Sequence, residues 1–158
     1  MTYHIKTLSK ENIPQIIDLY KDFLKDQLNK NKYCKKESIM DEKGMYECYN
    51  QFLNSKDEEL FLALDDKNEI IGFAAVSVMK PGFLFEFEKY GYIFDFFVKE
   101  GCRTFSLCLK LFKSCEDWAR THGCKYLTAY TYYFNEKVQK LLSFKKMDIY
   151  KICYIKNL

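Results

Sequence analysis

One carboxylate interrupts a segment that otherwise reads as a buried strand. Residues 91–98 are GYIFDFFV, rich in aromatic and β-branched side chains, with Asp95 in the middle. Because burial raises the pKa of a carboxyl group, Asp95 is the first candidate for a general base. An aspartate that accepts hydrogen bonds from backbone groups at a strand bulge is the alternative. Glu86 and Glu88 are the next candidates, although exposed edge carboxylates would explain them equally well.

The residues after this strand suit the binding of an anion. The strand pattern breaks at Gly101, Arg103 follows, and Leu107, Leu111 and Trp118 then recur at the spacing of a helix. The first N–H groups of a helix lack intrahelical partners, and the helix dipole adds to their attraction for phosphate. The sequence therefore predicts a phosphate-binding loop that Arg103 reinforces.

The order of strand, loop, helix and strand in residues 93–135 carries a family resemblance. Val98 precedes Arg103 by five residues, the helix contains the pattern E-x-W-A-x-x-x-G, and KYLTAYTYYFN follows it. At these residues the chain resembles the GNAT superfamily of N-acetyltransferases, whose pyrophosphate loop reads R-x-x-G-x-G. With its weaker ends, the resemblance covers nearly the whole chain.

The resemblance implies an α+β fold (α/β three-layer) over residues 1–158, taken as a single domain. Its central sheet would be mixed and mostly antiparallel, with a splayed strand pair and flanking helices. The patterns along the chain fit this order of elements. We expect strands over 3–7, 60–64, 70–79, 91–98, 126–131 and 149–155, and helices from Ser9, over 37–54, after Arg103 and over 135–142.

The resemblance also implies a reaction: direct transfer of an acetyl group from acetyl-CoA, the co-substrate, to a primary amine, with no metal. The pantetheine arm would lie along the splayed strands, bonded to backbone groups of Phe97 and Val98. Asn135 would also contact pantetheine, although a helix-capping role explains this residue alone. The pyrophosphate would rest on Arg103, Thr104, Phe105, Ser106, Leu107 and Cys108.

The loop and the last helix depart from the family pattern. Ser106 and Cys108 replace the two glycines of R-x-x-G-x-G, which adds side chains to a crowded turn but leaves the N–H donors. Leu142 stands where the family commonly has the tyrosine that protonates the leaving thiolate. Tyr132, together with Tyr130 and Tyr133 near it, is the candidate replacement. These departures favour the alternative of a non-catalytic module that binds acyl-CoA or a protein partner.

The composition of the chain excludes few classes of function. The net charge of +3 comes with very few arginines, so nucleic acid is an unlikely partner, and the seven cysteines lack CxxC pairs, which predicts reduced thiols rather than zinc or disulfides. No apolar run is long enough to cross a membrane, so we expect a soluble, cytoplasmic protein. The aromatic residues in 83–90, with Glu86 and Glu88, suit a small-molecule or peptide amine with an apolar body, or equally a homodimer interface.

Overall fold

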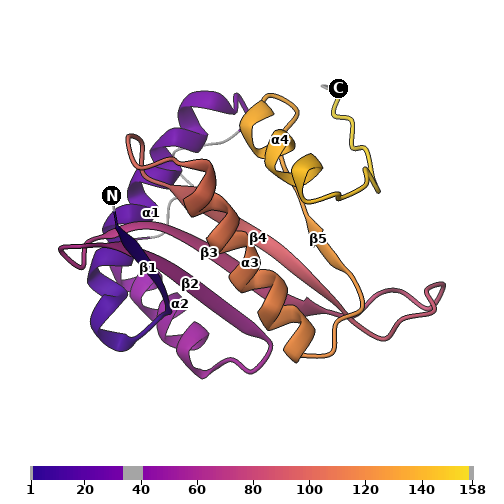
Figure 1. Cartoon of the computed structure of the whole chain (residues 1–158), viewed down its shortest axis with the longest axis horizontal. Helices are drawn as coiled ribbons and strands as arrows, with labels where there is room; N and C mark the ends of the chain where they lie inside the picture. The colour runs from indigo at the N-terminus through magenta and orange to yellow at the C-terminus, as the bar shows by residue number, and fades with distance from the viewer. Residues whose placement is uncertain (1, 34–40, 157–158) are drawn as a thin grey trace.

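The computed structural model describes residues 2–33 and 41–156, which form a sheet with helices on both faces (Figure 1). In chain order the elements are β1 Tyr3–Thr7, the 3₁₀ turn Lys10–Asn12, α1 Ile13–Lys30, α2 Glu42–Asn54, β2 Glu58–Asp65, β3 Ile70–Met79, β4 Tyr90–Val98, α3 Phe105–Thr121, β5 Leu127–Ala129 and α4 Glu136–Phe144. The strand order is β1-β2-β3-β4-β5, antiparallel except for the parallel pair β4 and β5. This three-layer α+β arrangement with a mixed sheet confirms the predicted fold class.

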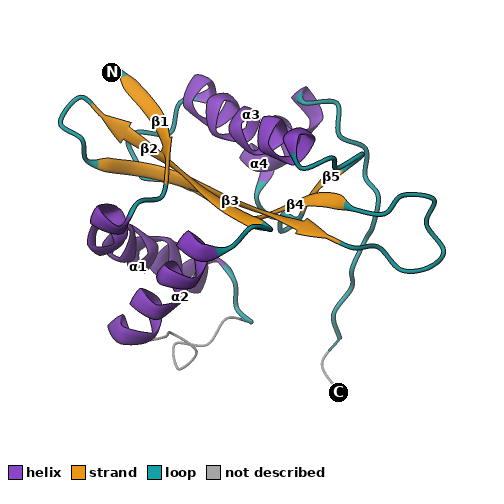
Figure 2. Cartoon of the chain, turned by 90° about the horizontal axis from the view of Figure 1, so that it is seen from below, coloured by secondary structure: helices purple, strands orange, loops and turns teal. Residues whose placement is uncertain are grey.

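Each face of the sheet has its own core. Figure 2 shows α1 and α2 on one face and α3 on the other. On the first face, Ile13 and Ile16 of α1 are fully buried against Phe73 of β3. On the second, Leu107 and Leu111 of α3 pack in one buried cluster with residues of β3 and β4. Coverage on both faces explains why β3 reads as a nearly unbroken apolar run, IIGFAAVSVM.

Replacing Leu111 by Ala tests how firmly α3 is held on the sheet. Leu111 is 0% exposed, so its truncation leaves a cavity and should lower the free energy of unfolding by about 2–5 kcal/mol. Leu109→Ala is the matched control, because Leu109 is only partly buried and belongs to neither core cluster. Chemical denaturation should show a much smaller loss for the control. Equal losses would contradict the assignment of Leu111 to the core.

Three elements predicted from the sequence differ from the structure or lie partly outside the described residues. The predicted terminal strand over 149–155 is wrong, since these residues are exposed and extended without strand partners among the described residues. The first helix begins at Ile13 rather than directly after Ser9, because a 3₁₀ turn comes first and Asn12 is the N-cap. Residues 37–40 of the predicted second helix lie outside the described residues. None of the described helices is long and apolar enough to cross a membrane.

Candidate active site at the divergence of β4 and β5

A bulge in β4 determines which way Asp95 faces. Ala75 of β3 pairs with Asp95, but the next residue, Val76, pairs with Ile93, so Phe94 is the extra residue on β4. Ala75 and Phe94 both belong to the core beneath α1 and α2. Residues directly opposite each other in an antiparallel pair share a face of the sheet. Asp95 and its neighbour Phe94 therefore both face α1 and α2.

Asp95 lies in an environment of tyrosines. Burial raises the pKa of its carboxyl group to about 6, and no hydrogen bond to this carboxylate is found among the described residues. Burial, with the Asp95 charge as the next cause, raises the pKa of Tyr20 on α1 to about 12. Burial likewise raises the pKa of Tyr49 on α2 and of Tyr92 on β4, with smaller contributions from Asp95. A proton-accepting group thus sits among hydroxyls that stay protonated at neutral pH.

A row of aromatic rings extends from α2 across β4 to the end of β5. The ring of Phe52 on α2 lies 5.9 Å from that of Phe94, which lies 6.1 Å from Tyr92. Tyr92 in turn lies 5.0 Å from Tyr130, the residue after β5. Tyr20, Tyr49 and Tyr92 were not predicted as site residues from the sequence, because only the register and the bulge bring them to the same face as Asp95.

β4 and β5 pair over three residues and then part. The pairs are Gly91 with Leu127, Tyr92 with Thr128 and Ile93 with Ala129, and the bulge follows immediately. β4 continues to Val98 with a partner on the β3 side, while its other edge is left without a strand in the described part of the chain. The predicted splayed strand pair is therefore present, and it begins beside Asp95.

The hydrogen-bond pattern of β4 shows which backbone groups face this unpaired edge. Lys99 N–H donates to the carbonyl of Ile71, so Lys99 and, by alternation, Phe97 turn their backbone groups to β3. The backbone groups of Phe96 and Val98 then point the other way, into the region that β5 leaves. Of the two residues expected to bond pantetheine, the structure places Val98 at this edge; Phe97 is engaged with β3, and Phe96 takes its place.

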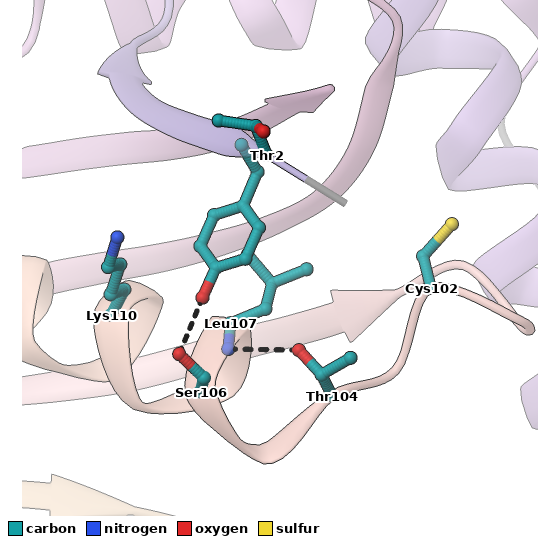
Figure 3. A pocket seen from close by; sticks show the side chains of 7 residues that line it. Thr2, Cys102, Thr104, Ser106, Leu107 and Lys110 are labelled. Atoms are coloured by element: carbon teal, nitrogen blue, oxygen red, sulfur yellow. Dashed lines mark hydrogen bonds between the residues drawn. The ribbon is translucent and has the colours of Figure 1, made fainter. Parts of the chain in front are cut away.

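The start of α3 forms a polar hollow with β1 (Figure 3). Thr104 is the N-cap, and its Oγ1 accepts a hydrogen bond of 3.2 Å from Leu107 N–H. The Ser106 hydroxyl lies 2.7 Å from the Tyr3 hydroxyl. Among the described residues, no acceptor is found for the N–H groups of Phe105 and Ser106, as expected for the first turn of a helix. The hollow, about 520 Å³, is lined by Thr2, Tyr3, Cys102, Thr104, Ser106, Leu107 and Lys110.

Two cationic side chains come from residues around the start of α3, and Lys110 is the one of the two that lines the hollow. Lys110 lies over the Tyr3 ring, 4.7 Å from its centroid, and was not anticipated from the sequence. Arg103 is turned toward the end of β4, where its Nε donates to the Val98 carbonyl at 2.7 Å. Its Nη2 lies 3.8 Å from Asp26 Oδ1 on α1. The guanidinium is thus engaged with the protein rather than directed at the first turn of α3.

Three other residues predicted from the sequence as site residues lie outside β4. Glu86 is exposed in the loop before β4, which Figure 1 shows projecting beyond the end of the sheet, so the structure does not bring it to Asp95. Tyr132 is half exposed and stacks on Phe134 with ring centroids 5.2 Å apart. Asn135 occupies the N-cap position of α4 without a side-chain capping bond. Burial raises the pKa of the Cys108 thiol near the start of α3, so its position at a helix N-terminus does not make it a reactive thiolate.

Comparison with known proteins finds the same fold in solved structures. None of the curated proteins compared with the chain matches it. A putative acetyl transferase from Pyrococcus furiosus is similar in structure, with a TM-score of 0.75 and 18% identity over 99% of this chain and 100% of that one. AAC(6')-Iy, solved with the bisubstrate analogue CoA-S-monomethyl-acetylneamine, gives a TM-score of 0.78 at 17% identity over 100% of both chains.

A third solved structure is similar to the chain, and a family model matches most of it. The aminoglycoside 6'-N-acetyltransferase AAC(6')-Ih from Acinetobacter baumannii gives a TM-score of 0.74 at 14% identity over 99% of each chain. At these identities the structural likeness establishes the fold. The model of the acetyltransferase (GNAT) family matches residues 16–145. Because these residues make up most of the sequence, the chain belongs to the GNAT family of acetyltransferases.

Proposed function

We propose that the protein is an N-acetyltransferase that transfers the acetyl group of acetyl-CoA directly to a primary amine of a small molecule or peptide. The observation that carries this proposal is the position of Asp95, a carboxylate with a pKa raised to about 6, beside the point where β4 and β5 part. Family membership supports the reaction class. The CoA-containing complex of AAC(6')-Iy, a structural neighbour, supports acetyl-CoA as the co-substrate.

In the proposed reaction a neutral amine attacks the thioester carbonyl. A C–N bond forms, the C–S bond breaks, the amine proton passes to Asp95 directly or through water, and CoA leaves as a thiolate that takes up a proton. The backbone groups of Phe96 and Val98 are in position to bond an extended arm along the unpaired edge of β4. Tyr132 is the proposed acid for the thiolate, and Tyr130, which packs on Tyr92, is the alternative phenol at this divergence.

The surroundings of Asp95 favour an acceptor with both a cationic and an apolar part. The Asp95 carboxylate would attract the protonated amine, which releases one proton to water to become the neutral nucleophile. Asp95 would then accept the second proton, which is lost as the C–N bond forms. Phe94, Tyr92 and Phe52 provide an aromatic surface against which an apolar body can pack. The aminoglycoside acetyltransferases among the structural neighbours support a small-molecule amine.

A second candidate function is a non-catalytic module that binds acyl-CoA or a protein partner. Two contacts favour it, because both engage groups that a phosphate would need. Arg103 Nε is bound to the Val98 carbonyl, and the Ser106 hydroxyl to the Tyr3 hydroxyl. Binding and turnover experiments distinguish the two candidates.

Calorimetric titration of acetyl-CoA and CoA into the protein is the direct test. We expect micromolar binding that Arg103→Ala weakens about 10-fold or more, since the variant loses the cation of the loop that joins the end of β4 to the start of α3. Arg120→Ala is the matched control, because it removes the same side chain from the other end of α3, where it forms exposed ion pairs. Equal effects of the two substitutions would remove Arg103 from the site, and no binding of either compound would overturn the acetyltransferase proposal.

A further inference from the structure

A second carboxylate lies on the same face of the sheet as Asp95. Glu58, the first residue of β2, comes two residues before Leu60, which belongs to the core beneath α1 and α2. Because side chains alternate along a strand, Glu58 turns to that face as well. Leu60 pairs with Ala75, and Ala75 pairs with Asp95. The two carboxylates therefore lie in neighbouring rows of one face.

Glu58 is partly buried and lacks a cationic partner. Among the residues that the structure describes, no lysine or arginine forms an ion pair with it. Burial, followed by the charges of Glu58 and Asp95, raises the pKa of the Cys48 thiol on α2, so both carboxylates lie near this side chain. A partly buried carboxylate without a cation is costly, and the cation of a ligand would offset that cost.

Ser77 lies beside Glu58 and carries a hydroxyl without a hydrogen-bond partner in the described part of the chain. It pairs with Glu58 on one side and with Tyr92 on the other, so these three side chains share the face of Asp95. Ser77 is only 6% exposed. No fully buried side-chain nitrogen or oxygen of the described residues lacks a partner, so the free Ser77 hydroxyl must itself reach the surface. It is available to a ligand next to Glu58.

Aromatic side chains lie between the row of Asp95 and the row of Glu58. Phe94 is the neighbour of Asp95, and its ring lies 6.1 Å from that of Tyr92, which belongs to the row of Glu58. The ring of Phe52 on α2 lies 5.9 Å from that of Phe94. These aromatic side chains are all partly exposed. They offer an apolar surface to a chain that runs from one carboxylate to the other.

The register gives the length of such a chain. Two strand spacings and two residues along the strand separate Glu58 from Asp95, which places their Cα atoms roughly 12 Å apart. An extended chain advances about 1.2 Å per bond, so two nitrogens joined by about eight methylene groups lie about 11 Å apart. A ligand of this length can reach both carboxylates.

We propose that the acceptor is a linear diamine or polyamine, and that Glu58 and the Ser77 hydroxyl bind its second ammonium group, the one remote from the reacting amine. This inference rests on the proposed function, because it places the reacting amine at Asp95. The methylene groups pack on Phe94 and Phe52. Two carboxylates with an apolar surface between them thus match two ammonium groups that an apolar chain joins.

Two amines of equal length test the second ammonium group in the wild type. Octylamine and 1,8-diaminooctane present the same reacting amine, but only the diamine carries a cation at its far end. At saturating acetyl-CoA we expect kcat/KM to be at least about 10-fold higher for the diamine after correction for its two equivalent ends. The gain should lie in KM, since the remote group binds equally in the ground and transition states. Equal values for the two amines would overturn the inference.

Glu58→Gln should remove this preference. The substitution keeps the size of the side chain and removes its charge, so KM for 1,8-diaminooctane should rise at least about 10-fold while octylamine is acetylated as by the wild type. Ser77→Ala should raise this KM less, because it removes a neutral partner. Glu59→Gln is the matched control, since Glu59 pairs with Val76 of the core beneath α3 and faces the other side of the sheet. Equal effects of Glu58→Gln and Glu59→Gln would remove Glu58 from the site and overturn the inference.

Glu58→Lys reverses the charge and separates this inference from the proposed function. We expect the variant to acetylate 8-aminooctanoate, whose far end is a carboxylate, in preference to 1,8-diaminooctane, the opposite of the wild type. The same order of the two acceptors in both proteins would overturn the inference and leave the acetyltransferase proposal in place. If the wild type bound acetyl-CoA but transferred its acetyl group to none of these amines, the proposed function would fail and this inference with it.

Discussion

Replacing Asp95 by Asn is expected to lower kcat for acetyl transfer by about 10²–10⁴-fold, the usual contribution of a general base. The affinity for acetyl-CoA should change little, because Asp95 faces α1 and α2 whereas the start of α3 lies on the other side of the sheet. Steady-state kinetics with an amine acceptor and calorimetry on the same samples measure the two quantities separately.

The pH dependence of the wild type should identify the same group. Only the ionised carboxylate can accept a proton, and its pKa is raised to about 6 by burial. We therefore expect Asp95 to contribute to the kcat/KM profile a tenfold rise per pH unit well below pH 6 that levels off above it, in addition to any rise from deprotonation of the amine. Residual activity of Asp95→Asn should lack this limb.

The same substitution should stabilise the protein at neutral pH. The carboxyl pKa is raised from 3.8 to about 6 in the folded state, so the folded protein binds a proton where the unfolded chain has released it. Stability is therefore lost as the pH rises from about 4 to 6, by up to about 3 kcal/mol above pH 6. Asn carries no charge to bury, and thermal melting at pH 8 should show a higher Tm for Asp95→Asn.

Asp66→Asn is the control for this pair of measurements, because Asp66 is exposed in the turn between β2 and β3. It should change neither kcat nor Tm appreciably. If Asp95→Asn left turnover unchanged, Asp95 would have no part in proton transfer. If it lowered Tm, the carboxylate would be a structural element of the bulge, which is the alternative explanation drawn from the sequence.

The sequence predicted those features that depend on local pattern. Hydrophobic periodicity located α3, and the spacing from Val98 to Arg103 placed the loop correctly between β4 and α3. The prediction of a buried carboxylate holds in part: Asp95 is partly buried, and its neighbours in β4 are apolar whatever the register. These features require only that a strand, a turn and a helix follow one another.

Features set by long-range contacts were not predictable in the same way. The bulge at Phe94 turns Asp95 toward Tyr20 and Tyr49, which come from distant helices, and no local pattern encodes that meeting. Likewise, Tyr3 contacts Ser106 from the far end of the chain. The isoleucines and tyrosines of residues 149–155 are typical of a strand, yet a strand forms only when an edge is available to pair with it.

Replacing Ser106 by Asp should weaken acetyl-CoA binding by at least about 100-fold, because it places a negative charge where the pyrophosphate is proposed to lie. Ser106 is in the first turn of α3, where an acidic side chain interacts favourably with the helix dipole. The protein should therefore keep its Tm while losing affinity. Calorimetry and thermal melting of the same preparation test both expectations.

Ser55→Asp provides the matched control for Ser106→Asp, since it makes the same chemical change far from the start of α3. Ser55 lies between α2 and β2. The first residue of β2 pairs with Ser77 near the end of β3, whereas Val98, the last residue of β4, pairs with Gly72 near the start of β3. Ser55 and the start of α3 therefore lie toward opposite ends of the sheet. We expect this control to bind acetyl-CoA like the wild type. If Ser106→Asp bound acetyl-CoA equally well, the phosphates would have to lie elsewhere, and the free N–H groups of Phe105 and Ser106 would have no role in binding. Loss of affinity in Ser106→Asp alone would place the pyrophosphate at the start of α3 even though Ser and Cys occupy the two glycine positions of the family loop.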